Sequence, residues 1–188
     1  MSLLELIFVV ASVIVGLGVA EVLTGVVRIL RGEFKAGLGQ GLWTVTVFLS
    51  LVQLVWAYWD LNAETSLTYA QYLTILWGPV ALFISASLLF PKEGDRPDGD
   101  LDDYLIEHRV VFLLSFLAFV AQTQVANWTL ESLTGSDGLA LILRLVVAAI
   151  TVSGFLTRNR LWHRVIPALL LAISLYFTAQ ITPVAGLQ

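Results

Sequence analysis

The chain of 188 residues lacks several residue types that soluble proteins and many enzymes need. It has no cysteine, which excludes disulfides, thiolate metal sites and a cysteine nucleophile. Only 13% of its residues are charged, whereas a soluble domain carries about 25% charged residues. So few charged groups cannot cover a water-soluble globule of this size. Water is therefore excluded as the solvent around most of the chain.

Motifs for catalysis and cofactor binding are also missing. The sequence has no phosphate-binding loop, dinucleotide fingerprint, His-Glu-x-x-His motif or Gly-x-Ser-x-Gly turn. Its two histidines, His108 and His163, have neither zinc-ligand spacing nor a neighbouring acid and nucleophile. A basic patch interleaved with aromatic residues is absent too. We therefore expect no enzyme activity, no metal or other cofactor, and no nucleic-acid partner.

Long hydrophobic runs are what the sequence does have. Hydrophobic residues make up 58% of the chain, and the mean hydropathy is +0.87. The runs are long enough for helices to cross a hydrocarbon layer of about 30 Å, and they lack the alternation of membrane-barrel strands. We predict an all-α integral membrane protein, a single domain over 1–188 that forms a bundle of six transmembrane helices. The predicted spans are 3–30, 41–61, 67–90, 101–131, 139–157 and 162–182, with an acidic cytoplasmic loop at 91–103.

The positions of lysine and arginine predict the orientation of this bundle. Of the ten Lys and Arg residues, all but Arg144 lie where the first, third and fifth predicted spans connect to the next span. Basic residues stay on the cytoplasmic side, so both termini are expected on the non-cytoplasmic side. The chain does not open with the basic segment of a cleaved signal peptide, so we expect the first span to be retained. The expected location is a lipid bilayer, namely a plasma membrane of the bacterial inner-membrane type.

Glu21 is a carboxylate inside the first predicted span. It shares a helical stripe with Ala11, Gly18 and Gly25, small residues that let another helix approach closely. Intramembrane carboxylates usually face a cavity or a partner. One interpretation is a proton or cation site. The alternative is a packed helix interface in which Glu21 bonds to a neighbouring side chain.

Several other polar residues fall in the outer halves of the predicted spans. Arg144 is expected either to extend towards the outer surface or to form a structural pair. The amides of the second and fourth spans either line a vestibule open to the outside or fix helix register by hydrogen bonding. The predicted substrate or ion pathway consists of Glu21, Gly18, Gly25, Gln53, Gln122, Gln124, Asn127 and Arg144.

Two further features concern the cytoplasmic side. The aspartates of loop 91–103 lack the EF-hand spacing, so we expect a solvated acidic loop, with Asp100 as the N-cap of the fourth span. Trp43 and Trp162 are expected to anchor helix ends at the membrane interface.

Two functions fit this sequence. The first is a channel or transporter for an ion, proton or small polar solute, in which outer amides admit the solute and Glu21 binds it. Pro79 and Pro167 favour it, because broken helices often line cavities. The alternative is a non-transporting scaffold, sensor or accessory subunit that packs against other membrane proteins. A homo-oligomer through small-residue helix faces, such as that of Gly18 and Gly25, fits either function.

Overall fold

The computed structural model describes residues 3–59, 68–92, 100–129 and 138–181. Over these residues the chain forms seven α-helices and no β-strand. The helices are α1 (Leu3–Leu30), α2 (Leu38–Trp59), α3 (Tyr69–Ser87), α4 (Leu101–Glu107), α5 (Arg109–Thr129), α7 (Gly138–Leu156) and α8 (Arg160–Ile181).

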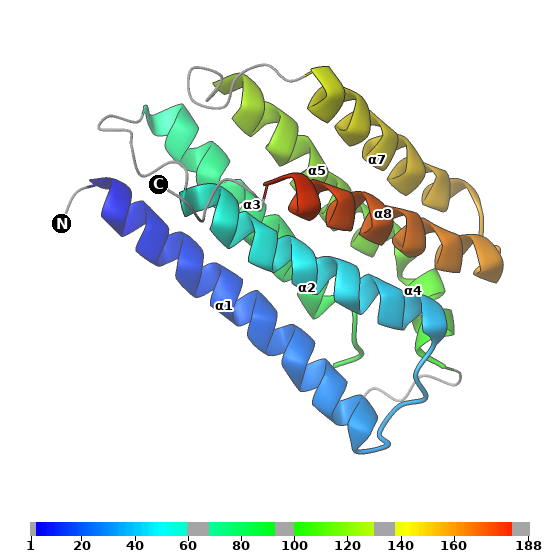
Figure 1. Cartoon of the computed structure of the whole chain (residues 1–188). Coiled ribbons are helices and arrows are strands. Elements are labelled where there is room, and N and C mark those ends of the chain that lie inside the picture. Colours follow the sequence, from blue (N-terminus) through cyan, green and yellow to red (C-terminus); the bar gives the residue numbers. More distant parts are fainter. Residues whose placement is uncertain (1–2, 60–67, 93–99, 130–137, 182–188) are drawn as a thin grey trace.

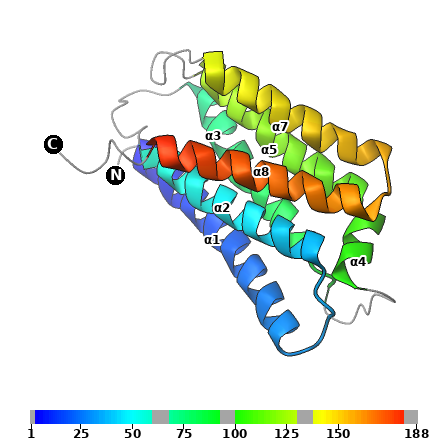
Figure 2. The same ribbon diagram turned by 45° about the vertical axis from the view of Figure 1, so that its right-hand side comes forward.

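The helices form two layers. In Figure 1, α1, α3, α5 and α7 lie side by side as a row in that order, and α2 and α8 lie together across one face of the row. Figure 2 shows the same arrangement from a second direction, with α1 and α7 at the two edges of the row. The short helix α4 closes one end of the bundle, where it contacts α2, α5 and α8.

The exposed surface of the bundle identifies its solvent. Five helices (α1, α2, α3, α5 and α8) are long and apolar enough to cross a membrane, and α7 contains a shorter apolar stretch, Leu141–Leu156. Large apolar side chains such as Leu17, Val52 and Leu145 are about half exposed on the outside of the bundle. Soluble monomers do not expose such continuous apolar surfaces. The chain is therefore an all-helical, polytopic protein built to lie in a membrane.

Helix boundaries differ from the predicted spans mainly at the fourth span. The first span, 3–30, coincides with α1, but the predicted span 101–131 is divided at His108 into α4 and α5. Asp100 is the N-cap of α4, as predicted, since its side chain accepts a hydrogen bond from the backbone N–H of Asp103 at 3.1 Å. The acidic segment therefore does not remain a loop throughout, because its last residues begin a helix that packs on the bundle.

Trp43 belongs to the core rather than to the membrane interface. Its side chain is 1% exposed and lies edge-to-face against Phe112 and Phe116, at ring-centroid distances of 4.8 and 5.2 Å. These three rings join α2 to α5, and edge-to-face pairs of this kind stabilise beyond simple burial. The prediction of an interfacial anchor at Trp43 is wrong, whereas Trp162 is exposed at the start of α8.

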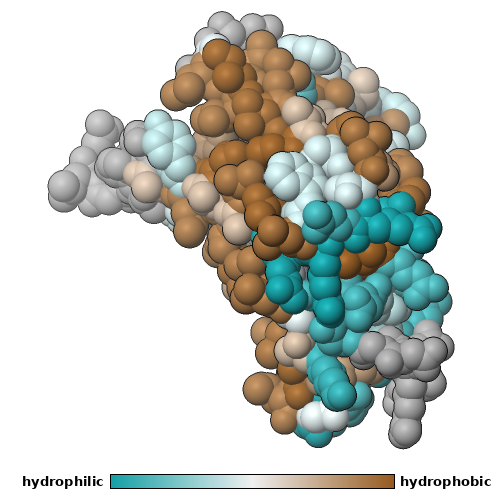
Figure 3. All heavy atoms as spheres, turned by 90° about the vertical axis from the view of Figure 1, so that its right-hand side faces the viewer, coloured by the Kyte–Doolittle hydropathy of each residue, from teal (hydrophilic) through white to brown (hydrophobic). Residues whose placement is uncertain are grey.

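Several connecting segments meet at one end of the bundle. Arg28 donates to the carbonyl of Pro91 at 2.8 Å, and the backbone N–H of Leu101 donates to the carbonyl of Lys35 at 3.0 Å. These contacts join the end of α1 and the segment after it to the segment after α3 and the start of α4. We call this end of the bundle the basic end, because Arg28, Lys35, Arg160 and Arg164 lie there. On the side of the molecule shown in Figure 3, hydrophilic residues gather in one area over α4 and the beginning of α8, bordered by hydrophobic residues.

Candidate functional site

Glu21 lies on the outer surface of α1. Its side chain is exposed, while Gly18, Val22 and Gly25 on the adjacent face of the helix are buried. A helix turns about 100° per residue, so Glu21 falls just beyond the buried stripe. No hydrogen bond or ion pair of Glu21 occurs within the described residues. The carboxylate therefore faces the surroundings of the bundle rather than its interior.

The two glycines flanking Glu21 are packing positions inside the monomer. A Cβ added to Gly18 would lie 3.1 Å from the Leu51 side chain and 3.6 Å from the backbone of Phe83, and one added to Gly25 would overlap the Phe90 ring. Gly18 and Gly25 thus let α2, α3 and the residues after α3 approach α1 closely. Their face is occupied within the chain, so it is not available to a second copy.

Glu21 lies within the apolar length of α1. Nine residues separate it from Leu30 at the end of the candidate span Glu5–Leu30, which corresponds to about 13 Å at 1.5 Å per residue. A carboxylate at this depth stands against lipid chains unless another protein covers it.

Gln53 joins α2 to α8. Its Nε2 donates to the carbonyl of Ser174 at 3.0 Å and to Oγ1 of Thr178 at 2.6 Å, and the Ser174 hydroxyl donates to Oε1 of Gln53 at 3.0 Å. Further along the same interface, the Thr46 hydroxyl lies 3.4 Å from the carbonyl of Pro167. Both contacts link residues 121 positions apart, so α2 and α8 run in the same direction with a fixed register.

Gln122 joins α5 to α3 beside a proline. Its side chain is 6% exposed and donates from Nε2 to the carbonyl of Thr74 at 3.1 Å. The amide fits because Gly78 has no side chain, since a Cβ there would lie 2.7 Å from Oε1 of Gln122. Pro79 follows directly, and a proline cannot donate to the carbonyl one turn earlier. The Gln122 amide thus joins α5 to α3 close to Pro79, at the carbonyl of Thr74.

Arg144 and Gln124 join α7 to α5. Nη1 of Arg144 donates to Oε1 of Gln124 at 3.4 Å, and the arginine is half-buried between the helices. Asn127 lies on α5, and its side chain falls outside the described part of the structure.

The predicted pathway residues are therefore distributed over separate helix interfaces. Gln53 lies between α2 and α8, Gln122 between α3 and α5, and Gln124 between α5 and α7. Each amide has a partner on the neighbouring helix. Within the described residues, these side chains and Glu21 do not line one shared pathway.

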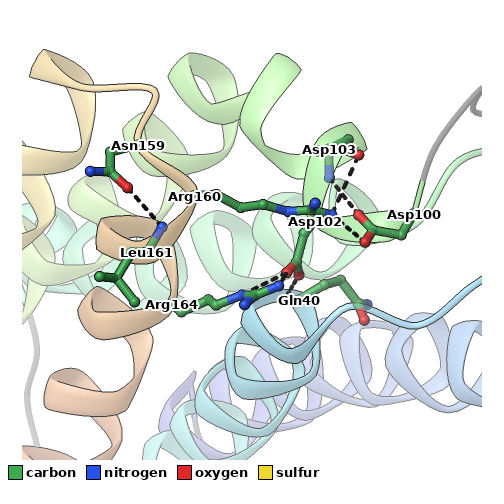
Figure 4. A network of polar contacts seen from close by, with 8 residues as sticks. All are labelled: Gln40, Asp100, Asp102, Asp103, Asn159, Arg160, Leu161 and Arg164. Atoms are coloured by element: carbon green, nitrogen blue, oxygen red, sulfur yellow. Dashed lines mark hydrogen bonds and ion pairs between the residues drawn. The ribbon is translucent and has the colours of Figure 1, made fainter.

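A network of acidic and basic side chains lies at the basic end and was not predicted as a site (Figure 4). Asp102 of α4 is 4% exposed, and its Oδ1 accepts a hydrogen bond from the backbone N–H of Gln40 at 2.8 Å. Its Oδ2 accepts from Arg164 of α8, with Nη2 at 3.0 Å and Nε at 3.1 Å. The carboxylate thus caps the first turn of α2 and pairs with α8 at the same time. Gly37 permits this approach, because a Cβ there would overlap the carboxylate.

A second, more exposed ion pair stands beside the first. Arg160 of α8 donates to the carboxylate of Asp100 and lies 3.4 Å from that of Asp103 (Figure 4). Partial burial raises the pKa of Asp100, but the backbone N–H of Asp103 and the Arg160 guanidinium lower it further, so the net pKa lies below the usual value of 3.8. Asp100 is therefore ionised in the folded protein at neutral pH.

The space next to this network is small. A cavity of about 10 Å³ lies among Gly39, Leu105, His163 and the ion-pair residues, which is room for about one water molecule. His163 is buried, and its Nε2 lies 2.9 Å from the carbonyl of Thr157. In the described residues no three His, Asp or Glu side chains gather as metal ligands would. The ion pairs to Arg160 and Arg164 and the bond to Gln40 fasten α4 to α8 and α2.

The sequence carries only a weak signal for this network. Leu101 and Leu105 are spaced by one helical turn and are both buried, and that spacing would have predicted an amphipathic α4. Nothing local distinguishes Asp102 from its exposed neighbour Asp103. Comparison of the chain with protein-family models, with curated proteins and with solved structures gives no match.

Proposed function

We propose that this protein is a non-transporting membrane module, a scaffold or accessory subunit that binds a transmembrane helix through the outer surface of α1. The observation that carries the proposal is the exposed Glu21 carboxylate on an apolar helix at the edge of the row. An unpaired carboxylate in hydrocarbon is destabilised by about 2.5–3.5 kcal/mol or more. A partner that supplies a hydrogen-bond donor would remove that penalty.

The polar groups inside the bundle support the same function. The Gln53, Gln122 and Gln124 side chains bond to neighbouring helices. Amides that bond between helices in this way fix helix register. The ion pairs of α4 and α8 add a further constraint at the basic end.

The proposal includes the orientation that the sequence predicts. In it, six helices cross a plasma membrane of the bacterial inner-membrane type, the basic end faces the cytoplasm, and both termini lie on the other side. The clustering of Arg28, Lys35, Arg160 and Arg164 at one end supports this orientation.

Ion and solute flux tests this function against the channel or transporter alternative. Purified protein reconstituted in liposomes should leave the vesicles as tight to K⁺, Na⁺, protons and small amides as protein-free vesicles. In producing cells, a photo-crosslinking amino acid at Leu17, on the outer surface of α1, should give specific adducts. The same amino acid at Leu145, similarly exposed on α7, is the control. Flux that the Glu21→Gln variant alters would overturn the proposal in favour of transport.

A further inference from the structure

The outer surface of α1 carries a hydrogen-bond acceptor and a donor one turn apart. Thr24 follows Glu21 by three residues, and both side chains are exposed. Neither makes a side-chain hydrogen bond within the described residues. Helix threonines often donate to the carbonyl one turn earlier, as Thr46 and Thr74 do here. Thr24 makes no such bond within the described residues, so its hydroxyl is still available to another molecule.

Apolar residues continue this surface towards the N-terminus of α1. Val10, Leu17 and Thr24 recur at intervals of seven, and Glu21 lies four residues after Leu17. Val10 is 37% exposed and Leu17 is 52% exposed. Alternating steps of four and three residues produce a straight seam along a helix, which is the pattern of a coiled-coil contact. α1 packs against α2 and α3 within the chain, and this seam lies on the exposed side of the helix, next to its buried stripe.

We propose that the partner of this seam is α1 of a second copy of the chain, giving a two-fold symmetric dimer in the bilayer. This inference rests on the proposed function, because it names the helix that the outer surface of α1 binds. Two copies inserted in the same orientation present parallel α1 helices. A two-fold axis makes every contact between the copies occur twice, once in each direction. The Thr24 hydroxyl of each copy donates to the Glu21 carboxylate of the other.

Self-complementarity is the reason for choosing a second copy over a different protein. The seam contains both the donor and the acceptor, so a copy of itself satisfies both groups without another chemical species. Such a pair forms two reciprocal hydrogen bonds, one from each Thr24 hydroxyl to the Glu21 carboxyl group of the other copy. The dimer would bury the exposed carboxylate between two helices instead of leaving it against lipid.

Cysteine cross-linking tests this dimer directly, because the chain contains no cysteine of its own. A single Leu17→Cys variant, purified and reconstituted in liposomes at a low protein-to-lipid ratio, should form disulfide dimers on mild oxidation. The matched control is Leu145→Cys, which is similarly exposed but lies at the opposite edge of the row. Equal cross-linking at the two positions, or none at Leu17, would overturn the dimer.

Two substitutions test the paired side chains by the dimer dissociation constant, measured by energy transfer between labelled copies. Thr24→Val removes both donors without changing side-chain shape and should raise the constant about three- to tenfold. Glu21→Gln keeps a hydrogen-bond acceptor and should raise it less than Glu21→Ala does. A constant unchanged by Thr24→Val would refute the reciprocal bonds.

Failure of this inference can be told apart from failure of the proposed function. Monomeric behaviour in tight liposomes, together with adducts from Leu17 to a different membrane protein in cells, rejects the second copy and keeps the module. Flux that depends on Glu21 rejects the module whatever the cross-linking shows.

Discussion

Asp102 on α4 and Arg164 on α8 form an ion pair with an O–N distance of 3.0 Å, although 62 residues separate them in the chain. The same carboxylate accepts the backbone N–H of Gln40 at the first turn of α2. A single side chain thus connects three helices. Because it is buried, the loss of either bond would destabilise the folded protein.

Replacing Asp102 should destabilise the fold. Asp102→Ala leaves the Gln40 N–H and the Arg164 guanidinium without their acceptor, so the free energy of unfolding should fall by about 1–3 kcal/mol. Asp102→Asn keeps an acceptor for Gln40 and should cost less. Reversible unfolding in detergent, followed by circular dichroism, measures both.

The control for this experiment is Asp103→Ala, whose side chain is 55% exposed and should change stability little. A double-mutant cycle with Arg164→Met separates the pair from the helix cap. Strictly additive effects of Asp102→Ala and Arg164→Met would contradict the ion pair.

The Asp100–Arg160 pair predicts a pH dependence of stability. The pKa of Asp100 is lowered in the folded state, so its stabilising effect is fully present above the unfolded-state value near 3.8 and is lost as the pH falls through the folded-state value. Asp100→Asn keeps the helix cap but removes the charge. The difference in melting temperature between wild type and Asp100→Asn should be largest at neutral pH and disappear as the pH falls below about 4. A difference that stays constant over this range would show that the ion pair contributes nothing.

Gly78 should be intolerant of a side chain for a specific reason. A Cβ at this position lies 2.7 Å from Oε1 of Gln122, so Gly78→Ala should destabilise the fold by about 1–3 kcal/mol through overpacking. Gly41→Ala is the matched control, since nothing lies within 4 Å of its added Cβ. Combining Gly78→Ala with Gln122→Ala should recover part of the loss, and thermal unfolding in detergent measures each variant. Equal melting temperatures for Gly78→Ala and Gly41→Ala would show that the amide does not need this space.

Labelling should place the connecting segments on one side of the membrane. Cysteines at Lys35, Lys92 and Arg158 are expected to react with a membrane-impermeant maleimide only from the cytoplasmic side. A cysteine at Tyr69, at the opposite end of α3, is expected to react only from the other side. Labelling of positions 35 and 158 from opposite faces would reject the six-span orientation.

The sequence predicts the helices of this protein well, because their existence depends on hydrophobic length alone. α1 has the predicted bounds, and α7 and α8 begin within two residues of the predicted spans. The break at His108 was not predicted. It depends on α4 turning to pack against α2 and α8, whose residues are distant in the chain.

The environments of individual polar residues could not be predicted in the same way. The sequence places Glu21 and Gly18 on nearly the same stripe, since three residues differ by about 60° around a helix. The buried edge of α1 falls inside that angle, so Gly18 is buried and Glu21 exposed. Asp102 likewise differs from Asp103 only in which helices lie opposite it. Such distinctions depend on tertiary packing, which one sequence does not contain.

The pairing of α1 with α3 has a consequence for the biogenesis of the protein. Gly25 is covered by the Phe90 ring, which leaves the ribosome long after α1 and α2 are complete, whereas Gly18 already meets Leu51 of α2. During synthesis Gly25 must therefore remain exposed to lipid or to the insertion machinery until the third hydrophobic segment and Phe90 follow. A nascent chain halted after α2 would leave Gly25 uncovered, and cellular quality control would encounter it in that state.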